Sequence, residues 1–424
     1  MQFSALSPQE LRQLYEQAKK THEADKALGL KLDMSRGKPG SEQLSLSMEL
    51  LTIPQTAADC RENGVDLRNY GGMDGIASCK TLFAELLGVP ADQVFVGGNA
   101  SLSLMYDTIA KAYTHGLLNS DKPWSKLDEV RFLCPAPGYD RHFGISESFG
   151  MTLIPIPMTA EGPDMDAVET AIKDPAVKGM WCVPKYSNPE GVVYSEAVVN
   201  RIAAMRPAAK DFLLMWDNAY CVHEFDGPFV PFPDILSLCE RHGNADMPFE
   251  YASTSKITFP GAGVAVFACS KANMAYMKKL INFQTISYDK INQLRHARFL
   301  KNKENTLTLM QKHAAILKPR FEAVLQALDE RVAPLGIASW NRPRGGYFVS
   351  LDTMPFCARR TWELCRDAGV VMTGAGATFP YGKDPEDKNL RIAPTLPPVN
   401  ELNQAVAVFI NSLKLATLEK LLGK

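Results

Sequence analysis

The chain has no C-x-x-C pair, and its cysteines are scattered. Nine cysteines occur in 424 residues, an odd number without regular spacing. A disulfide framework or a zinc knuckle needs paired, closely spaced cysteines, so we expect neither. We interpret the nine as reduced thiols in or near the core of a cytoplasmic protein.

Runs of one charge and long apolar runs are also missing. The formal net charge is −1, and no basic cluster stands out, so nucleic acid and anionic membranes are poor partners. No apolar stretch is long enough to cross a bilayer, and residues 1–20 carry charges at helical spacing instead of the apolar core of a signal peptide. The seven histidines show no H-E-x-x-H spacing, so no metal site is expected.

What the chain does have, from about Val94 to Phe267, is an alternation of short apolar runs with amphipathic helical patterns. This alternation is typical of the α/β class, with a mostly parallel sheet covered by helices. We predict a sheet of seven strands: Val94–Val96, Val130–Leu133, Thr152–Ile154, Met180–Val183, Phe212–Trp216, Phe249–Ala252 and Gly261–Ala268. After about Asp289, long helices and short strands predict a smaller α+β domain that includes the N-terminal helix. The large domain is expected over residues 48–295, and the small domain over 1–47 and 296–424.

The segment Ser253-Thr254-Ser255-Lys256 lies between the last two predicted strands. A lysine on such a turn can be desolvated, which disfavours the ammonium form and leaves an amine able to attack a cofactor carbonyl. Lys256 is therefore a candidate Schiff-base lysine. The alternative is a surface lysine that follows a Ser/Thr turn.

In an open parallel sheet, ligands bind beyond the carboxyl ends of the strands. The strand Phe212–Trp216 ends in Asp217, with Tyr220 three residues on. An aspartate there needs a cationic partner, such as a protonated ring nitrogen, unless it caps the next helix. The strand Met180–Val183 leads to Asn188 in an N-P turn, which could also be purely structural.

Two further strand ends carry binding features. The strand Val94–Val96 runs through Gly98, Asn99, Ala100 and Ser101 into a helix, the arrangement in which free N–H groups hold a phosphate. The strand Val130–Leu133 leads to Tyr139 on a Pro-Gly turn, where an aromatic ring could lie against a planar cofactor or simply pack on the surface.

In this order, the motifs resemble the fold-type I pyridoxal-phosphate aminotransferases of class I/II, from about Leu32 to Ala393. The resemblance implies the fold of those transferases and pyridoxal 5'-phosphate as cofactor. It implies that Lys256 forms the Schiff base, Asp217 pairs with the ring nitrogen, and Tyr220 and Asn188 bond the phenolate oxygen. Tyr139 would stack on the ring and His142 would support Asp217. The residues implied to bind the cofactor phosphate are Gly98, Asn99, Ala100, Ser101, Ser253 and Ser255.

The same resemblance extends to the substrate and to a partner subunit. Arg391 matches the arginine that grips the substrate α-carboxylate, although an ordinary salt bridge is the alternative. Gly37, in the segment Ser35–Gly40, joins the implied substrate-binding residues. Tyr70 resembles the tyrosine that such enzymes contribute to the neighbouring subunit's phosphate site, so a homodimer with shared active sites follows.

Within the family, the chain resembles the subgroup of bacterial aspartate aminotransferases and the aminotransferase-like half of MocR-type regulators. Only residues 1–31 precede Leu32, without a basic recognition helix, so a transcription regulator is not expected. One position departs from the family. Most members carry a phosphate-binding arginine eight residues after the lysine, and here that residue is Val264.

The implied reaction moves an amino group from an L-amino acid to 2-oxoglutarate. The subgroup favours L-aspartate, whose side chain needs a second cation, and Arg36, Lys38, Arg141 and Lys185 all lie near predicted site loops. Another amino donor, or a pyridoxal-phosphate lyase or decarboxylase, remains open. A further alternative is a non-enzymatic effector module that binds pyridoxal phosphate. Such a module would not need a substrate-binding arginine, so the presence of Arg391 disfavours it.

Overall fold

The centre of the molecule, in a computed structural model that describes residues 2–424, is an eight-stranded sheet in the order β4-β11-β10-β9-β8-β5-β6-β7. Its strands are β4 (Val94–Val96), β5 (Arg131–Ala136), β6 (Thr152–Thr159), β7 (Gly162–Pro163), β8 (Val177–Cys182), β9 (Leu213–Asp217), β10 (Pro248–Ser253) and β11 (Ala265–Cys269). Strands β5, β6, β8, β9 and β10 pair in parallel, whereas β11 is antiparallel to both of its neighbours. The predicted mostly parallel α/β sheet is confirmed.

All seven predicted strands are present, with two differences. The eighth strand, β7, is only two residues long and pairs antiparallel with the end of β6. A Gly-Pro pair carries no alternation that could reveal it. The last predicted strand was wrong at its start, because Pro260–Ala262 form a 3₁₀ turn and β11 begins only at Ala265. Pro260 has no N–H to give to a strand ladder.

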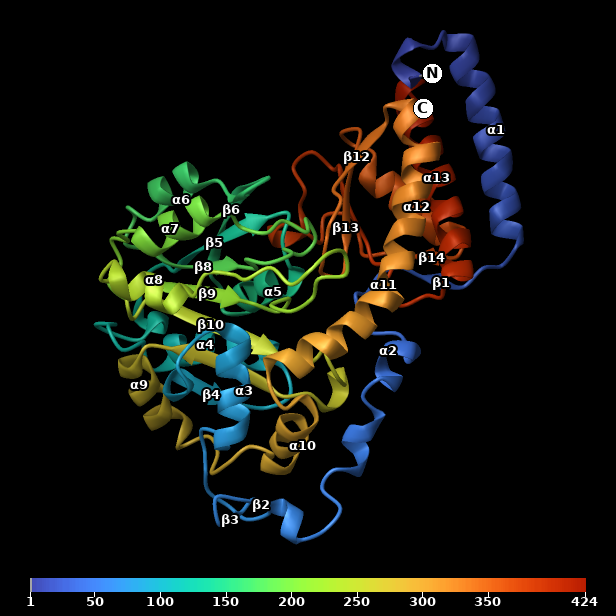
Figure 1. The fold of residues 1–424 in the computed structure, drawn as a ribbon. Coiled ribbons are helices and arrows are strands. Elements are labelled where there is room, and N and C mark those ends of the chain that lie inside the picture. The colour runs from blue at the N-terminus through green and yellow to red at the C-terminus, as the bar shows by residue number, and fades with distance from the viewer. Residues whose placement is uncertain (1) are drawn as a thin grey trace.

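Helices cover both faces of this sheet (Figure 1). Along β9, Leu213 and Met215 pack into one apolar core, while Leu214 and Trp216 pack into another. This alternation follows from the two-residue period of a strand. The first core includes α4 (Ser101–Thr114), α5 (Asp140–Ser148) and α9 (Lys271–Ile281). The second includes α3 (Ala77–Leu87), α6 (Met165–Ala171), α7 (Glu196–Ala204), α8 (Ile235–Arg241) and α10 (Lys290–Leu300).

A smaller body is built around a third core. It holds the antiparallel strands β12 (Ala338–Trp340), β13 (Val349–Thr353) and β15 (Asn389–Ile392), and the parallel pair β1 (Leu32–Asp33) and β14 (Val370–Val371). Its helices are α1 (Pro8–Ala27), α2 (Ser41–Ser45), α11 (Lys303–Arg331), α12 (Ala358–Asp367) and α13 (Val399–Leu421). Helices α1 and α13 lie side by side, with the two chain ends close together (Figure 1). The N-terminal helix thus joins the C-terminal part of the chain.

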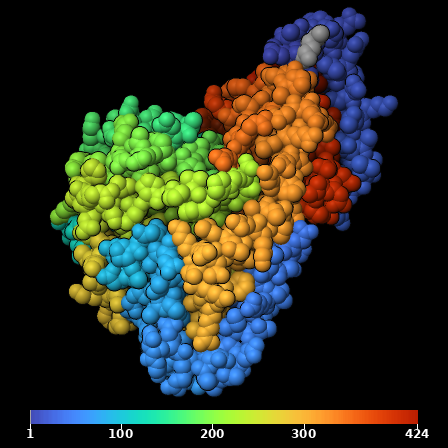
Figure 2. Space-filling model, viewed as in Figure 1, coloured from blue at the N-terminus to red at the C-terminus, as the bar shows by residue number. Residues whose placement is uncertain are grey.

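Helix α11 connects the two bodies. Its residues Leu309 and Met310 pack into a core of the larger body, whereas Leu317 and Phe321 pack into that of the smaller one. The segment with the short pair β2 (Arg61–Glu62) and β3 (Val65–Asp66), drawn in blue, runs along the lower edge of the larger body (Figure 2). The domain boundary at residue 295 stays a prediction. No helix within residues 2–424 is both long and apolar enough to cross a membrane.

Candidate active site

The candidate site is a cavity of about 700 Å³ at the carboxyl ends of β8, β9 and β10, closed on its other side by the smaller body. This is where a parallel sheet places its ligand. Eleven of the residues expected at the site line it: Gly37, Ala100, Ser101, Tyr139, Asn188, Asp217, Tyr220, Ser253, Ser255, Lys256 and Arg391. Segments far apart in the chain therefore meet in one cavity.

Lys256 lies on the turn between β10 and β11, as predicted. The turn is held by Thr254, whose Oγ1 accepts the Val264 N–H at 2.9 Å and whose N–H donates to the Val264 carbonyl at 2.8 Å. Burial lowers the pKa of Lys256, and the charge of Asp217 opposes that shift. The Nζ atom lies 4.9 Å from the centre of the Tyr220 ring. A desolvated amine thus faces the cavity.

Asp217 ends β9 with one oxygen paired and the other unpaired. Its Oδ2 lies 3.0 Å from Nε2 of His142, whose ring stacks on Trp181 at 4.3 Å between centroids. Its Oδ1 is buried and has no hydrogen-bond partner in residues 2–424. A buried carboxylate oxygen without a donor is costly, and a protonated ring nitrogen in the cavity would satisfy it.

Two phenols stand beside this pair. Burial, followed by the charges of Asp217 and Asp140, raises the pKa of Tyr139 to about 12. Burial also raises the pKa of Tyr220 well above its usual value, so both side chains are neutral and can donate a hydrogen bond. The Tyr139 ring meets the edge of His142 at 4.9 Å between centroids.

Arg391 reaches the cavity from β15 and is buried. Its Nη1 donates to Asp140 Oδ1 at 3.0 Å and to Asn188 Oδ1 at 3.1 Å, and its Nη2 donates to Thr373 Oγ1 at 3.1 Å. Its Nε has no partner among the described residues. The guanidinium is thus held between both bodies and keeps an unused donor.

Only some of the residues expected to bind the cofactor phosphate line the cavity. Ala100 and Ser101 line it at the start of α4, and the Ala100 cap makes no side-chain hydrogen bond, which leaves first-turn N–H groups for an anion. Gly98 and Asn99 lie just before them but do not line the cavity. Val264 is buried in the core, so no cation stands at that position.

Tyr70 does not line the cavity, and 79% of its surface is exposed. Lys290 Nζ holds its segment by donating to the carbonyls of Asn69 at 2.5 Å and Gly71 at 2.6 Å. The expectation that Tyr70 serves a neighbouring subunit stays a prediction.

Some site residues escaped sequence reasoning. Asp140 and Thr373 line the cavity and hold Arg391, yet neither belongs to a motif, although Asp140 directly follows Tyr139. Arg36, Lys38 and Arg141, which were expected near the site loops, do line the cavity. Lys185 does not, because its Nζ is buried against Glu224 Oε1 at 2.5 Å.

The chain matches the family model described as aspartate amino-transferase over residues 6–424. It is 47% identical to an aspartate aminotransferase of Corynebacterium glutamicum, over 96% of this chain and 94% of that protein. A crystal structure of an aspartate transaminase from Corynebacterium glutamicum superposes with a TM-score of 0.95, at 45% identity over 99% of both chains. The α-aminoadipate aminotransferase LysN of Thermus thermophilus shares the fold, with a TM-score of 0.73 at 21% identity over 92% of this chain and 93% of that one.

The fold and the site therefore define an aminotransferase of fold type I, as the sequence motifs predicted. The chain belongs to the aspartate aminotransferase family.

Proposed function

We propose that the protein binds pyridoxal phosphate on Lys256 and transfers an amino group from L-aspartate to 2-oxoglutarate. The observation that carries the proposal is the buried Lys256 amine beside Asp217, whose Oδ1 lacks a donor within the described chain. When bound, pyridoxal phosphate supplies a carbonyl that condenses with an amine and a ring that accepts the electrons released at the substrate Cα.

The residues of the cavity fit this cofactor. Asp217 Oδ1 would accept a hydrogen bond from the protonated ring nitrogen and so keep the proton there, with His142 fixing the second carboxylate oxygen. Tyr139 would lie against the ring, and Tyr220 and Asn188 would hold the phenolate oxygen as hydrogen-bond donors. The start of α4, with Ser101, Ser253 and Ser255, holds the phosphate. The match to the aminotransferase family model over residues 6–424 and the position of these residues around one cavity support these roles.

Lys256 is the base of the reaction. With pyridoxal phosphate and substrate bound, the Lys256 amine would accept the proton from the substrate Cα and would then serve as the acid that gives it back. The lowered pKa of Lys256 supports this role because a neutral amine can accept a proton. Arg391 would receive the α-carboxylate on the guanidinium that Asp140 and Asn188 hold in place.

The choice of aspartate rests on surplus positive charge. Arg36, Lys38 and Arg141 line the cavity, and none of the three makes an ion pair within residues 2–424. Arg141 also stands in the first turn of α5, where the helix dipole disfavours a cation. A side-chain carboxylate of the substrate would balance the unpaired positive charge in the cavity and would also offset the unfavourable position of Arg141. The relative from Corynebacterium glutamicum, named an aspartate aminotransferase, supports the same donor.

A cytoplasmic homodimer is part of the proposal. All nine cysteines are buried and none forms a disulfide within the described chain, which supports a reducing compartment. Large apolar side chains that are strongly exposed suit a subunit interface: Leu51, Tyr70, Phe283 and Ile286. In such a dimer, Tyr70 would help to hold the phosphate of the other subunit's cofactor. Sedimentation of the wild type at two concentrations measures the assembly.

The absorbance spectrum of the holoenzyme tests the function. We expect the band of the lysine-bound cofactor to disappear when L-aspartate is added, with oxaloacetate released and the band restored by 2-oxoglutarate. Lys256→Ala should lack both the band and turnover. A wild-type band that L-aspartate leaves unchanged would refute this donor and favour another amino acid. Carbon dioxide or another cleavage product would indicate a decarboxylase or lyase.

A further inference from the structure

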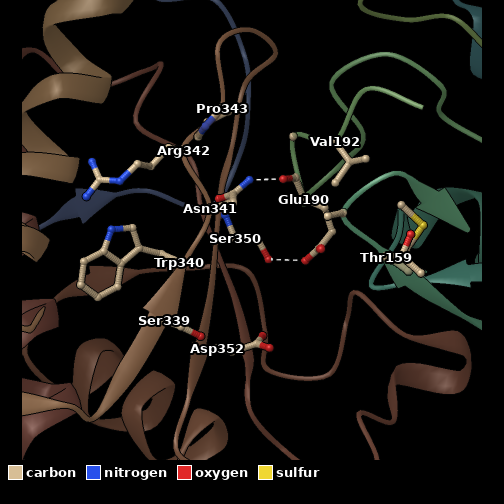
Figure 3. Close-up of a pocket in the computed structure, with 13 residues that line it drawn as sticks. Thr159, Glu190, Val192, Ser339, Trp340, Asn341, Arg342, Pro343, Ser350 and Asp352 are labelled. Carbon is tan, nitrogen blue, oxygen red and sulfur yellow. Dashed lines mark hydrogen bonds between the residues drawn. The ribbon is translucent and has the colours of Figure 1, made fainter. Parts of the chain in front are cut away.

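The turn that carries Asn188 touches the smaller body at a second point, outside the active-site cavity. A separate cleft of about 480 Å³ lies between this turn and the strands β12 and β13. Glu190, two residues after Asn188, reaches across it (Figure 3). Its Oε1 accepts a hydrogen bond from Ser350 Oγ at 2.9 Å, and its backbone carbonyl accepts one from the Asn341 side chain.

These contacts form a directed chain of hydrogen bonds. Asn389 Nδ2 donates to Ser350 Oγ at 2.9 Å, and the Ser350 hydroxyl in turn donates to Glu190 Oε1. Asn341 accepts the Ser350 N–H at 2.7 Å through its Oδ1 while its amide holds the Glu190 carbonyl. Because Ser350 already accepts from Asn389, its hydroxyl needs an acceptor on the opposite side. Glu190 supplies that acceptor.

Ser350 is the cross-strand partner of Arg391 in the pair β13 and β15. Directly opposed residues of an antiparallel pair point to the same face of the sheet. One face of the smaller body therefore makes two hydrogen bonds to the same turn. Arg391 donates to Asn188 at 3.1 Å, and Ser350 donates to Glu190 at 2.9 Å.

The backbone of the turn is shaped for this contact. Gly191 has φ +67, and a Cβ atom there would lie 2.7 Å from Cβ of Pro343 and 2.9 Å from Nδ2 of Asn341. Only glycine fits both the left-handed backbone and the close approach. The turn can thus lie flat against the end of β12.

We propose that Glu190 is a positioning residue for the substrate-binding arginine: through Ser350 it holds β13 and β15 on the Asn188 turn and so sets where the Arg391 guanidinium meets the α-carboxylate. The inference rests on the proposed function of Arg391. It assigns the acid of the Asn188–Gly191 turn a role in affinity for every substrate with an α-carboxylate, whatever its side chain.

The alternative is that Glu190 only stabilises the fold. Its burial is costly, since burial raises its pKa and the nearby charge of Asp352 adds to the shift, while Ser350 and Lys388 oppose it. In that case the hydrogen bond from Ser350 to Glu190 would offset the cost of burial and contribute only to the free energy of unfolding. The two roles differ in their effect on substrate affinity. A positioning residue changes the Kd only when Arg391 is present, whereas a residue that only stabilises the fold acts independently of Arg391.

The test is a double-mutant cycle on substrate affinity. The probe is 2-methyl-L-aspartate, which has no Cα proton to lose, titrated into the holoenzyme and followed by absorbance. We expect Glu190→Ala to raise its Kd about fivefold, the value of one hydrogen bond, with the cofactor band unchanged. In an Arg391→Ala background the same change should have no further effect. Glu190→Gln keeps an acceptor oxygen for Ser350 and should restore the wild-type Kd.

A second cycle needs no cofactor. Urea unfolding of the apoprotein should show that Glu190→Ala and Ser350→Ala are not additive, because both remove the same contact. Equal Kd increases with and without Arg391, or additive effects on unfolding, would overturn the proposal. A wild type that binds the probe while Glu190→Ala leaves the Kd unaltered refutes this inference alone. A wild type that forms no cofactor band or does not bind the probe refutes the proposed function and this inference with it.

Discussion

Glu250 on β10 should carry a proton in the folded protein at neutral pH. It is buried, and its Oε1 accepts from Asn218 Nδ2 at 2.8 Å. Its Oε2 and the Asn218 Oδ1 are both buried without a partner in residues 2–424. A proton on Glu250 could be donated to Asn218 Oδ1 and would satisfy both oxygens at once. Burial raises the pKa of Glu250 to about 8, with the charge of Asp234 adding to the shift and the Asn218 hydrogen bond opposing it.

The sign of the pH dependence follows from this shift. In the unfolded chain Glu250 has an ordinary pKa of 4.5, so between pH 4.5 and about 8 only the folded state keeps the proton. The stabilisation is complete below pH 4.5 and is lost as the pH rises through about 8. Each pH unit within this window lowers the free energy of unfolding by about 1.4 kcal/mol, which amounts to about 5 kcal/mol over the whole window.

Glu250→Gln removes the titration and keeps the pairing, because a glutamine can both donate to and accept from the Asn218 amide. We expect the unfolding free energy of the variant to rise relative to wild type by about 4 kcal/mol between pH 5 and pH 8. Urea unfolding of both apoproteins at intervals across this range measures the difference. Glu16→Gln, at an exposed site on α1, is the control and should follow the wild type. Parallel curves for wild type and Glu250→Gln would show that Glu250 is ionised when folded and would refute the reasoning.

Two further substitutions separate catalysis from stability. Arg391→Ala removes a charge-assisted contact to the α-carboxylate, so kcat/KM should fall about 100-fold, or about 3 kcal/mol, while the cofactor band persists; unchanged steady-state kinetics would exclude Arg391 from the site. Lys185→Met leaves Glu224 buried without its cation and should lower the free energy of unfolding by about 3 to 5 kcal/mol in urea titrations. If Lys185→Met is as stable as the wild type, the pair at 2.5 Å contributes nothing to the fold.

The position of the site could be predicted because it follows a general rule of parallel sheets. Asp217 is the last residue of an apolar strand, and Asn188 and Tyr139 follow two others. The carboxyl ends of such strands meet at one edge. Lys256 was found in the same way, from a turn between two apolar strands. Strand order, hydrophobic period and motif order are local properties, and the sequence carries them directly.

The partners across the two bodies could not be predicted. Asp140 and Arg391 lie 251 residues apart in the chain, and Glu190 and Ser350 lie 160 apart. No periodicity links such pairs, since they meet only when the smaller body packs on the edge of the larger sheet. Lys185 shows the same limit, because its loop position made it a candidate for substrate binding until the fold placed Glu224 against it.

By itself, the sequence determined the α/β sheet, the aminotransferase family and the residues at the strand ends, because these depend on short-range pattern and chain order. Only the tertiary structure decided which charges remain available in the cavity. Lys185 is neutralised by a buried acid and Arg391 is shared between Asp140 and Asn188, whereas Arg36 and Arg141 line the cavity without an ion pair in the described chain. The physical reason is that the state of a charged side chain depends on its burial and on its neighbours in space, and both are fixed by packing between segments distant in the chain.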